Sequence, residues 1–267
     1  MGCLLKQGGG LYARLRVGAV LLAAGEGRRM GGVSKPLMTL QGVPLIKRHL
    51  IALSGAGVDE VVVVTGHARD AVEVQVQRFP VTLAHNPNYA EGQQVSVRVG
   101  LAALSGNFDA VLMVLADQPL IGSADLIELI AAFKKRTSGH VVVPMVHGQR
   151  GNPIVLDDVA LAKVLASDTD LGCRQLIERQ PDLVHVHLTG NTRFITDLDT
   201  VEDVQRLAQR TGWRIEFPAA EGGSGASGLL VSMAAGGDSP TRAPELSSMA
   251  TEGSEVAAAP SAAPARQ

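Results

Sequence analysis

Cysteine is scarce in this sequence, and long apolar runs are missing. Cys3 and Cys173 are the two cysteines among 267 residues. They are too few for a secreted domain held by disulfides, so a cytoplasmic location is expected. Apolar runs such as residues 111–116 are far shorter than the ~20 residues that span a bilayer. The net charge of −2 argues against the basic surface that a nucleic-acid binder needs. We therefore expect no binding to membrane or nucleic acid.

The two ends of the chain differ in composition from the middle. Residues 218–267 are rich in Ala, Gly, Ser and Pro and contain no aromatic residue. Such a segment buries too little apolar surface to offset its ordering entropy, so it is predicted to be a disordered tail, with no role for its apolar residues 229–231. Residues 1–16 are predicted to be a flexible extension. Residues 17–217 remain as one folded domain.

Strand and helix patterns alternate within residues 17–217. Continuous apolar runs predict buried strands, and apolar residues at helical spacing predict helices, with Ser123 as an N-cap and Ser96 at a helix start. Repeated strand–loop–helix units imply a three-layer α/β fold with a mainly parallel sheet, whose ligands bind at the carboxyl ends of the strands. The predicted strands are 17–23, 60–65, 81–85, 110–115 and 141–145, and the predicted helices are 44–53, 96–104 and 123–136.

A glycine-rich, basic loop follows the first predicted strand. Residues 21–36 read LLAAGEGRRMGGVSKP. Glycines such as Gly25 and Gly27 let backbone amides approach a ligand, and Arg29 and Lys35 add positive charge, which together fit a polyphosphate. The loop does not match the Walker pattern and is one residue too long for the dinucleotide fingerprint GxGxxG. The alternative is a glycine-rich surface loop with solvated arginines.

The string LAAGEGRRMGG, followed by Lys35 and Pro36, resembles the signature of the MobA-like NTP transferases, the family that includes the molybdenum-cofactor guanylyl- and cytidylyltransferases. The resemblance covers about residues 17–210. It implies a Rossmann-like nucleotidyltransferase (nucleotide-diphospho-sugar transferase) fold, with Arg29 and Lys35 gripping the triphosphate. It also implies base recognition by the backbone at the strand end, at Leu22, Ala23, Ala24 and Gly25, with Gly27 in the same loop.

A carboxylate stands where a second apolar run ends. In VLMVLADQPLI, residues 111–121, the run ends at Asp117, where a carboxylate can hold Mg²⁺ against the phosphates of a nucleotide. Capping the turn before Pro119 is the alternative role. The family carries Asp in the same D-x-P context as its magnesium ligand. The resemblance therefore implies Mg²⁺ as cofactor and a catalytic role for Asp117 beside Lys35 and Arg29.

A later acidic segment, ITDLDTVED at residues 195–203, resembles the family's D-x-D-T-P-E-D segment, with Val201 in place of the usual proline. Asp197 and Asp199 alternate along an extended backbone, so both side chains point the same way and either is a candidate metal ligand. The alternative is structural, because Thr200 and Asp203 have the spacing of a capping box.

The segment HNPNYAEGQQVSVRVGL, residues 85–101, resembles the H-N-P-x-Y-x-x-G-x-x-x-S-V segment of the molybdopterin cytidylyltransferase branch. Gly92 permits a sharp turn, and the helix expected from Ser96 presents its amide end to the nucleotide. An ordinary turn and N-cap are the alternative roles. The residues expected on the nucleotide here are Asn86, Gly92 and Ser96, together with Thr65 and Gly66 after the strand at 60–65.

The acceptor substrate is expected on the far side of the sheet's midpoint. GQRGNPIVL, residues 148–156, resembles the G-x-x-G-H/N-P segment of the same branch and places a cation beside a turn, as suits a pterin phosphate. Cys173 is expected to be a packing residue, because phosphoryl transfer needs no thiol. His185 and His187 alternate on a strand without an evident third metal ligand. The expected acceptor-binding residues are Arg150, Gly151, Asn152, Pro153 and Arg174.

These features predict a Mg²⁺-dependent nucleotidyltransferase that transfers CMP from CTP to the phosphate of molybdopterin and releases pyrophosphate. The same family features leave open GTP-dependent guanylyl transfer and cytidylyl transfer to a sugar or polyol. Some relatives are described as oxidoreductases, although the sequence shows no flavin or nicotinamide fingerprint. A further alternative is a non-catalytic accessory protein that delivers the molybdenum cofactor to a hydroxylase or its chaperone.

Overall fold

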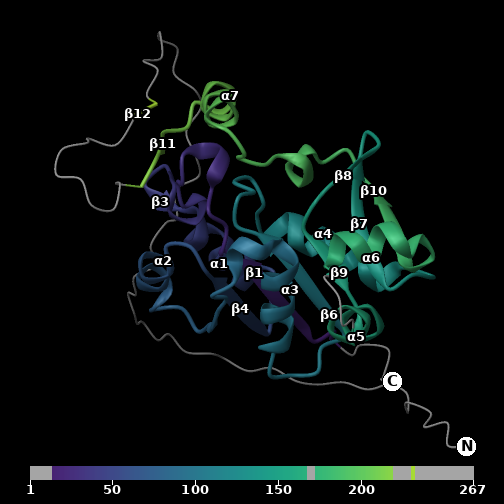
Figure 1. Ribbon diagram of the computed structural model, residues 1–267. Helices are drawn as coiled ribbons and strands as arrows, with labels where there is room; N and C mark the ends of the chain where they lie inside the picture. Colours follow the sequence, from purple (N-terminus) through teal and green to yellow (C-terminus); the bar gives the residue numbers. More distant parts are fainter. Residues whose placement is uncertain (1–13, 167–171, 219–229, 232–267) are drawn as a thin grey trace, which may run out of the picture. The chain divides into compact units, whose positions relative to one another are not determined.

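Eight strands form one large sheet in the computed structural model, which describes residues 14–166, 172–218 and 230–231 (Figure 1). Their order is β10-β7-β9-β6-β1-β4-β5, with β8 paired to β7. Most neighbours are parallel, and β9 is antiparallel to both β6 and β7. The strands are β1 (Val17–Leu22), β4 (Glu60–Thr65), β5 (Thr82–His85), β6 (Ala110–Leu115), β7 (Val141–Val146), β8 (Gln149–Arg150), β9 (Ile154–Leu156) and β10 (Val184–Leu188).

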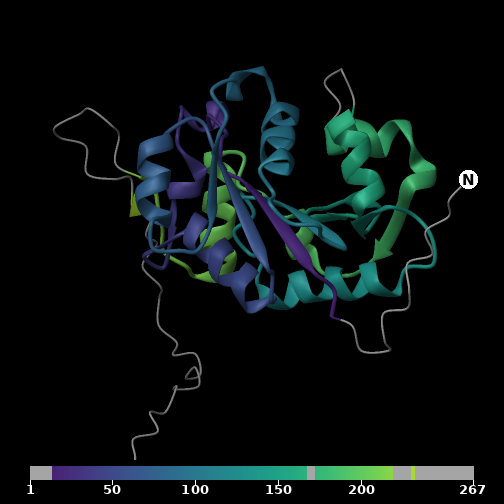
Figure 2. The same ribbon diagram turned by 90° about the horizontal axis from the view of Figure 1, so that it is seen from below.

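Helices cover both faces of this sheet, as the alternating units predict. Every residue of β1 is buried, because its side chains pack alternately into two cores: Ala19 and Leu21 into one, Val20 and Leu22 into the other. Figure 2 shows α3, α5 and α6 above the strands and α1 and α4 below them. The first core includes α1 (Leu45–Gly55), α2 (Arg69–Val76) and α4 (Ser123–Lys135), and the second includes α3 (Gln93–Ala102), α5 (Asp158–Ala166) and α6 (Cys173–Arg179).

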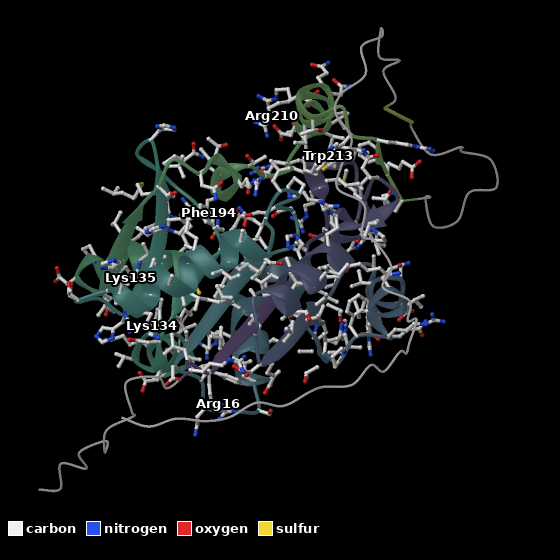
Figure 3. The ribbon with its side chains drawn as sticks, turned by 180° about the vertical axis from the view of Figure 1, so that it is seen from behind. Arg16, Lys134, Lys135, Phe194, Arg210 and Trp213 are labelled. Atoms are coloured by element: carbon white, nitrogen blue, oxygen red, sulfur yellow. The ribbon has the colours of Figure 1, made fainter. Side chains whose placement is uncertain are left out.

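A small second sheet and α7 (Val201–Thr211) form a third core, which also includes Met30 of the loop that follows β1. Met38, Leu40 and Leu207 are buried in it, and the Arg48 guanidinium lies 5.4 Å from the centre of the Trp213 ring. Figure 3 labels Trp213 close to α7. The strands of this sheet, in the order β12-β11-β2-β3, are β2 (Thr39–Leu40), β3 (Val43–Pro44), β11 (Ile215–Glu216) and β12 (Leu230–Val231).

The predicted strands agree with the observed ones to within one residue at each end. Apolar runs mark the buried strands β1, β6 and β7, whereas β5 is largely exposed. The helix starts are corrected. Helix α3 begins three residues before Ser96, with Gly92 at its N-cap, and Ser96 binds Asn86 inside the helix. Helix α4 has Gly122 as its N-cap, and the backbone N–H of Gly122 donates to the Asp125 carboxylate. Ser123 is therefore the first helical residue, where a side chain cannot cap.

The small sheet and the antiparallel β9 were not predicted from the sequence, because strands of two or three residues carry no periodic pattern. Leu230–Val231, inside the predicted tail, pair with β11. Residues 219–229 and 232–267 of that tail and residues 1–13 of the predicted extension lie outside the described residues, so the disorder of the tail and the flexibility of the extension stay predictions. Residues 167–171 also lie outside the described residues. No described helix has the length and apolarity needed to cross a membrane.

A titratable side chain of α1 is buried near the end of β6. His49 of α1 is 1% exposed, and neither ring nitrogen makes a well-formed hydrogen bond to the described residues. Desolvation lowers the pKa of His49 to about 4, and the nearby Ala116 backbone offsets only part of that effect. The folded protein therefore holds His49 neutral.

We expect the unfolding free energy of the His49→Leu variant to fall less at acid pH than that of the wild type. The folded pKa lies below the unfolded value of about 6.5, so unfolding takes up a proton, and stability falls as pH drops through 6.5 toward 4. Between pH 7 and pH 5 the wild type should lose about 2 kcal/mol more unfolding free energy than the variant. Urea unfolding at both pH values measures this, and equal losses would show that His49 is charged in the folded protein.

Candidate functional site

The carboxyl ends of three parallel strands meet at one edge of the sheet. Leu22 at the end of β1 is in register with Leu115 of β6 and Val64 of β4. The backbone pairing continues past the strands, because the Ala116 N–H donates to the Leu22 carbonyl. The glycine-rich loop, Asp117 and the turn after β4 consequently leave the sheet side by side, as expected for a ligand site in this type of fold.

The glycine-rich loop is held in a tight conformation that needs Gly27. Its φ of 61° is left-handed, and a Cβ there would lie 1.9 Å from the Val33 carbonyl oxygen. The Gly27 carbonyl accepts hydrogen bonds from the N–H groups of Met30 and Gly32. Short 3-10 turns follow at Arg28–Met30 and Lys35–Leu37, and Met30 is buried in the third core. The cations of the loop are thereby presented toward the sheet edge.

Lys35 lies between two carboxylates that are far apart in the sequence. Its Nζ is 3.1 Å from Asp117 Oδ2 and 2.7 Å from Asp199 Oδ1. Arg29 Nη1 is 3.1 Å from the other oxygen, Oδ2, of Asp199. The Lys35 side chain is 16% exposed, whereas that of Arg29 is 76% exposed. The structure thus brings together the cations and carboxylates that the sequence analysis assigned to one site.

Burial and neighbouring charges shift the pKa values of Lys35 and Asp197. Burial would lower the pKa of Lys35, but the charge of Asp117 and the hydrogen bond to Asp199 outweigh it, and the pKa is raised. Asp197 is exposed as a whole residue, yet its carboxyl group faces Gln118. Desolvation there, together with the charge of Asp117, raises the pKa of Asp197 to about 6. Asp199 lines the pocket that is described below, whereas Asp197 does not line it and lies near Asp117.

A pocket of about 450 Å³ opens at this edge. Its walls come from the end of β1, the glycine-rich loop, the start of α3 and the end of β6. Among its lining residues are most of those predicted for the nucleotide: Leu22, Ala23, Ala24, Gly25, Gly27, Arg29, Lys35, Gly92, Ser96 and Asp117.

Three residues predicted to contact the nucleotide do not line the pocket. Thr65 is fully buried and donates to Glu73. A Cβ on Gly66 would lie 2.8 Å from the side chain of Ala24, so Gly66 allows the β4 turn to pack behind the pocket wall. Asn86 is 1% exposed and donates to the Ser96 hydroxyl. Gly66 and Asn86 therefore support the lining residues Ala24 and Ser96 from behind.

A second pocket of about 360 Å³ adjoins the first. The two share Leu22, Gln93 and Leu115 in their linings. Of the predicted acceptor residues, Arg150, Asn152 and Arg174 line it, whereas Gly151 and Pro153 do not. Both arginines of this pocket lie near Glu178: Arg150 at 3.7 Å and Arg174 at 2.9 Å. The lining combines these cations with apolar side chains of β6, β9, α3 and α6.

The structural roles considered for other residues hold in several cases. Thr200 caps α7 in a capping box with Asp203, as the spacing indicated. Cys173 is 9% exposed and lines the second pocket, and burial raises the pKa of its thiol to about 12. It is therefore a packing residue and a poor nucleophile. His187 Nε2 lies 2.8 Å from Glu128 Oε1, and the described residues contain no group of three or more His, Cys, Asp or Glu placed to hold a metal ion.

Several lining residues were missed by the sequence analysis, and Tyr89 and Gln93 are two of them. Tyr89 and Gln93 line the first pocket, and Gln93 also lines the second. Both lie in the segment 85–101, whose resemblance to the cytidylyltransferase branch was already noted. Gln93 was missed because the helix was expected to begin at Ser96, whereas α3 begins at Gln93, directly after Gly92.

Comparison with known proteins agrees with this geometry. Residues 19–184 match the family described as the MobA-like NTP transferase domain. The chain is 30% identical over 203 residues to nicotine blue oxidoreductase of Paenarthrobacter nicotinovorans, covering 72% of this chain and 96% of that protein. It is 33% identical over 128 residues to bifunctional protein GlmU of Pelobacter propionicus, but covers only 28% of that longer protein and 48% of this chain.

A solved structure shows the same fold. The nucleotidyl transferase from Methanothermobacter thermautotroptrophicus superimposes with a TM-score of 0.61 at 23% identity, covering 73% of this chain and 97% of that one. At that identity the likeness supports the Rossmann-like nucleotidyltransferase fold alone. The family match over residues 19–184, with the 30% identity to a relative covered over 96% of its length, makes the assignment: the chain belongs to the MobA-like NTP transferase family.

Proposed function

We propose that this protein is a cytoplasmic, Mg²⁺-dependent nucleotidyltransferase that transfers CMP from CTP to the phosphate of molybdopterin, releasing pyrophosphate. Membership of the family supports nucleotidyl transfer. The observation that carries the proposal is the contact of Lys35 with both Asp117 and Asp199 at the wall of a pocket that adjoins a second, arginine-lined pocket. Two adjoining pockets suit a reaction with a nucleotide and an acceptor.

The carboxylates fit a magnesium ion that is shared with the nucleotide. Asp117 Oδ1 is buried and has no hydrogen-bond partner among the described residues, which leaves a hard oxygen donor free. The described side chains do not form a complete metal cage. Mg²⁺ usually takes one or two carboxylates and completes its shell with water and substrate phosphates. Asp117, with Asp199 or Asp197, would hold Mg²⁺ in this way, and the ion would neutralise charge on the triphosphate.

The chain's own residues account for the remaining requirements. The backbone from Leu22 to Gly25 offers the base a wall at the end of β1, and Arg29 and Lys35 face the phosphates. As the leaving pyrophosphate gains charge, these cations stabilise it. A phosphate acceptor is largely ionised at neutral pH, so no side chain is needed as a general base. Catalysis then depends on alignment and on charge neutralisation.

The acceptor is assigned to the second pocket. Arg150 and Arg174 supply positive charge for a phosphate, and the apolar lining from Ile154 and Ile177 suits a flat ring system. The two pockets share Leu22, Gln93 and Leu115 in their linings, which supports an acceptor that binds next to the nucleotide. A molybdenum hydroxylase or its chaperone would then receive the product. GTP as the donor and a sugar or polyol acceptor remain alternatives within the same chemistry.

Removing either central charge should abolish most of the activity. We expect Asp117→Ala and Lys35→Ala each to lower turnover at least ~100-fold with the fold intact, as loss of one electrostatic stabiliser does. Steady-state pyrophosphate release measures this. The matched controls Asp182→Ala and Lys134→Ala remove exposed charges elsewhere and should keep normal rates. Near-normal turnover in either site variant would contradict the assigned roles.

Lys35 and a divalent cation should compete for the same carboxylates. In the free protein the ammonium neutralises Asp117 and Asp199, so we expect Lys35→Gln to bind Mn²⁺ about fivefold more tightly without nucleotide, equivalent to ~1 kcal/mol of ion-pair energy. The same variant should bind CTP more weakly. Titration followed by electron paramagnetic resonance measures free Mn²⁺, with Lys134→Gln as the control. Unchanged or weaker Mn²⁺ binding would place the metal elsewhere.

The choice of nucleotide is tested by ligand-induced stabilisation. With Mg²⁺ present, we expect CTP to raise the melting temperature more than GTP, ATP or UTP, because specific ligands stabilise the folded state by mass action. GTP giving the largest shift would indicate guanylyl transfer. No shift with any triphosphate would overturn the proposal, and so would oxidation of a nicotinamide cofactor without pyrophosphate release, given the oxidoreductase name of one relative.

A further inference from the structure

The main-chain carbonyl of Phe194 joins the acceptor side of the site to the carboxylate side. It accepts hydrogen bonds from the backbone N–H of Asn152 at 2.9 Å and from the side-chain amide Nε2 of Gln118 at 3.1 Å. Asn152 lines the second pocket, whereas Gln118 follows Asp117 directly. Figure 3 labels Phe194 on the segment that leads toward α7, and its side chain is fully buried in the main core.

The same junction holds the acidic segment in place. The side chain of Gln118 also lies next to the carboxylate of Asp197. One residue further, the backbone N–H of Leu198 donates to the carbonyl of Asp117 at 3.0 Å. The end of β6 is therefore fastened to the 194–198 segment by its main chain and by the side chain of Gln118. Asp199 follows directly and contacts Lys35.

On the acceptor side, the turn approaches Phe194 so closely that only glycine fits. A Cβ on Gly151 would lie 2.6 Å from the carbonyl oxygen of Phe194 and 2.9 Å from its Cβ. The Gly151 N–H donates to the Pro144 carbonyl of β7 at 2.9 Å. Arg150, on the neighbouring strand β8, reaches the second pocket from this turn. A shift of the Phe194 carbonyl would therefore move the acceptor-binding turn.

Burial of the Gln118 side chain destabilises the fold, so stability alone does not explain this residue. The side chain is 0% exposed, and its Oε1 has no hydrogen-bond partner among the described residues. A buried carbonyl without a partner destabilises the fold, whereas an apolar side chain of the same shape is nearly neutral or stabilising. The hydrogen bond from its Nε2 to the Phe194 carbonyl is thus the feature that needs explaining.

We infer that Gln118 is a positioning residue, which sets the spacing between the acceptor-binding turn and the carboxylates through the Phe194 carbonyl. The inference rests on the proposed two-substrate reaction for its functional consequence, but not for its structural one. Without the Gln118 amide, the Phe194 carbonyl loses one of these two hydrogen-bond donors and is held less firmly. The hydrogen bond from the Asn152 N–H to the same carbonyl then weakens. We expect the nucleotide pocket to change less, because Gln118 does not line it and the hydrogen bond from the Leu198 N–H to the Asp117 carbonyl does not involve the Gln118 side chain.

Amide hydrogen exchange tests the structural part without any substrate. Gln118→Met keeps the length of the side chain and removes its hydrogen bond to the Phe194 carbonyl, and Gln118→Leu provides a second apolar variant. In either folded variant, exchange of the Asn152 amide should accelerate at least about tenfold, the loss expected for one buried hydrogen bond. The control His140→Leu removes a hydrogen bond to Asp157 at the opposite end of β7 and should leave Asn152 protected. Unchanged Asn152 protection in the Gln118 variants would overturn the inference.

Kinetics and melting temperature test the functional part. With CTP and molybdopterin, we expect Gln118→Met to raise KM for the acceptor about tenfold, keep KM for CTP within about twofold, and melt no lower than the wild type. An equal rise in both KM values with a lowered melting temperature would indicate a merely structural role and contradict the inference. Absence of transfer by the wild type itself would defeat the proposed function, while the exchange of Asn152 would still decide the positioning role.

Discussion

The contact of one ammonium group with two carboxylates organises the candidate site. Lys35 binds Asp117, 82 residues away in the sequence, and Asp199, 164 residues away. Asp117 and Asp199 would repel each other without a cation between them. Lys35 therefore keeps the two carboxylates close together, and a metal-bound triphosphate can replace this contact. The glycine-rich loop, the end of β6 and the segment before α7 all lie where this contact requires them. The third core contains both Met30 of the glycine-rich loop and Leu198 of the acidic segment, so its packing also brings these two segments together.

Much of the fold follows from patterns that are local in the sequence. The runs at 17–22, 60–65 and 110–115 are buried on both faces, and such runs are recognisable because no polar residue interrupts their core. Helix starts were harder, since Gly92 and Gly122 are the N-caps where serine was the expected capping residue. The two-residue strands of the small sheet exist only through pairing with distant segments. No local period could announce them.

The site was predictable where chemistry and strand ends coincide. Asp117 and Lys35 were found because each follows a recognisable strand or loop, and the structure joins them. Thr65, Gly66 and Asn86 were placed on the nucleotide because they also follow strands, but their side chains or backbones pack behind the wall. Whether a residue faces the pocket or supports it depends on the packing of β4 against the loop after β1. The sequence does not encode that in any short motif.

The central claim is that Lys35, Asp117 and Asp199 act together on a metal-bound nucleoside triphosphate. A crystal structure with Mg²⁺ and a non-hydrolysable CTP analogue tests it most directly. We expect the Lys35 ammonium to contact a phosphate oxygen, the base to rest against the backbone of Leu22 to Gly25, and Asp117 to coordinate the ion. A nucleotide bound away from this edge of the sheet, with Lys35 still between Asp117 and Asp199, would contradict the claim.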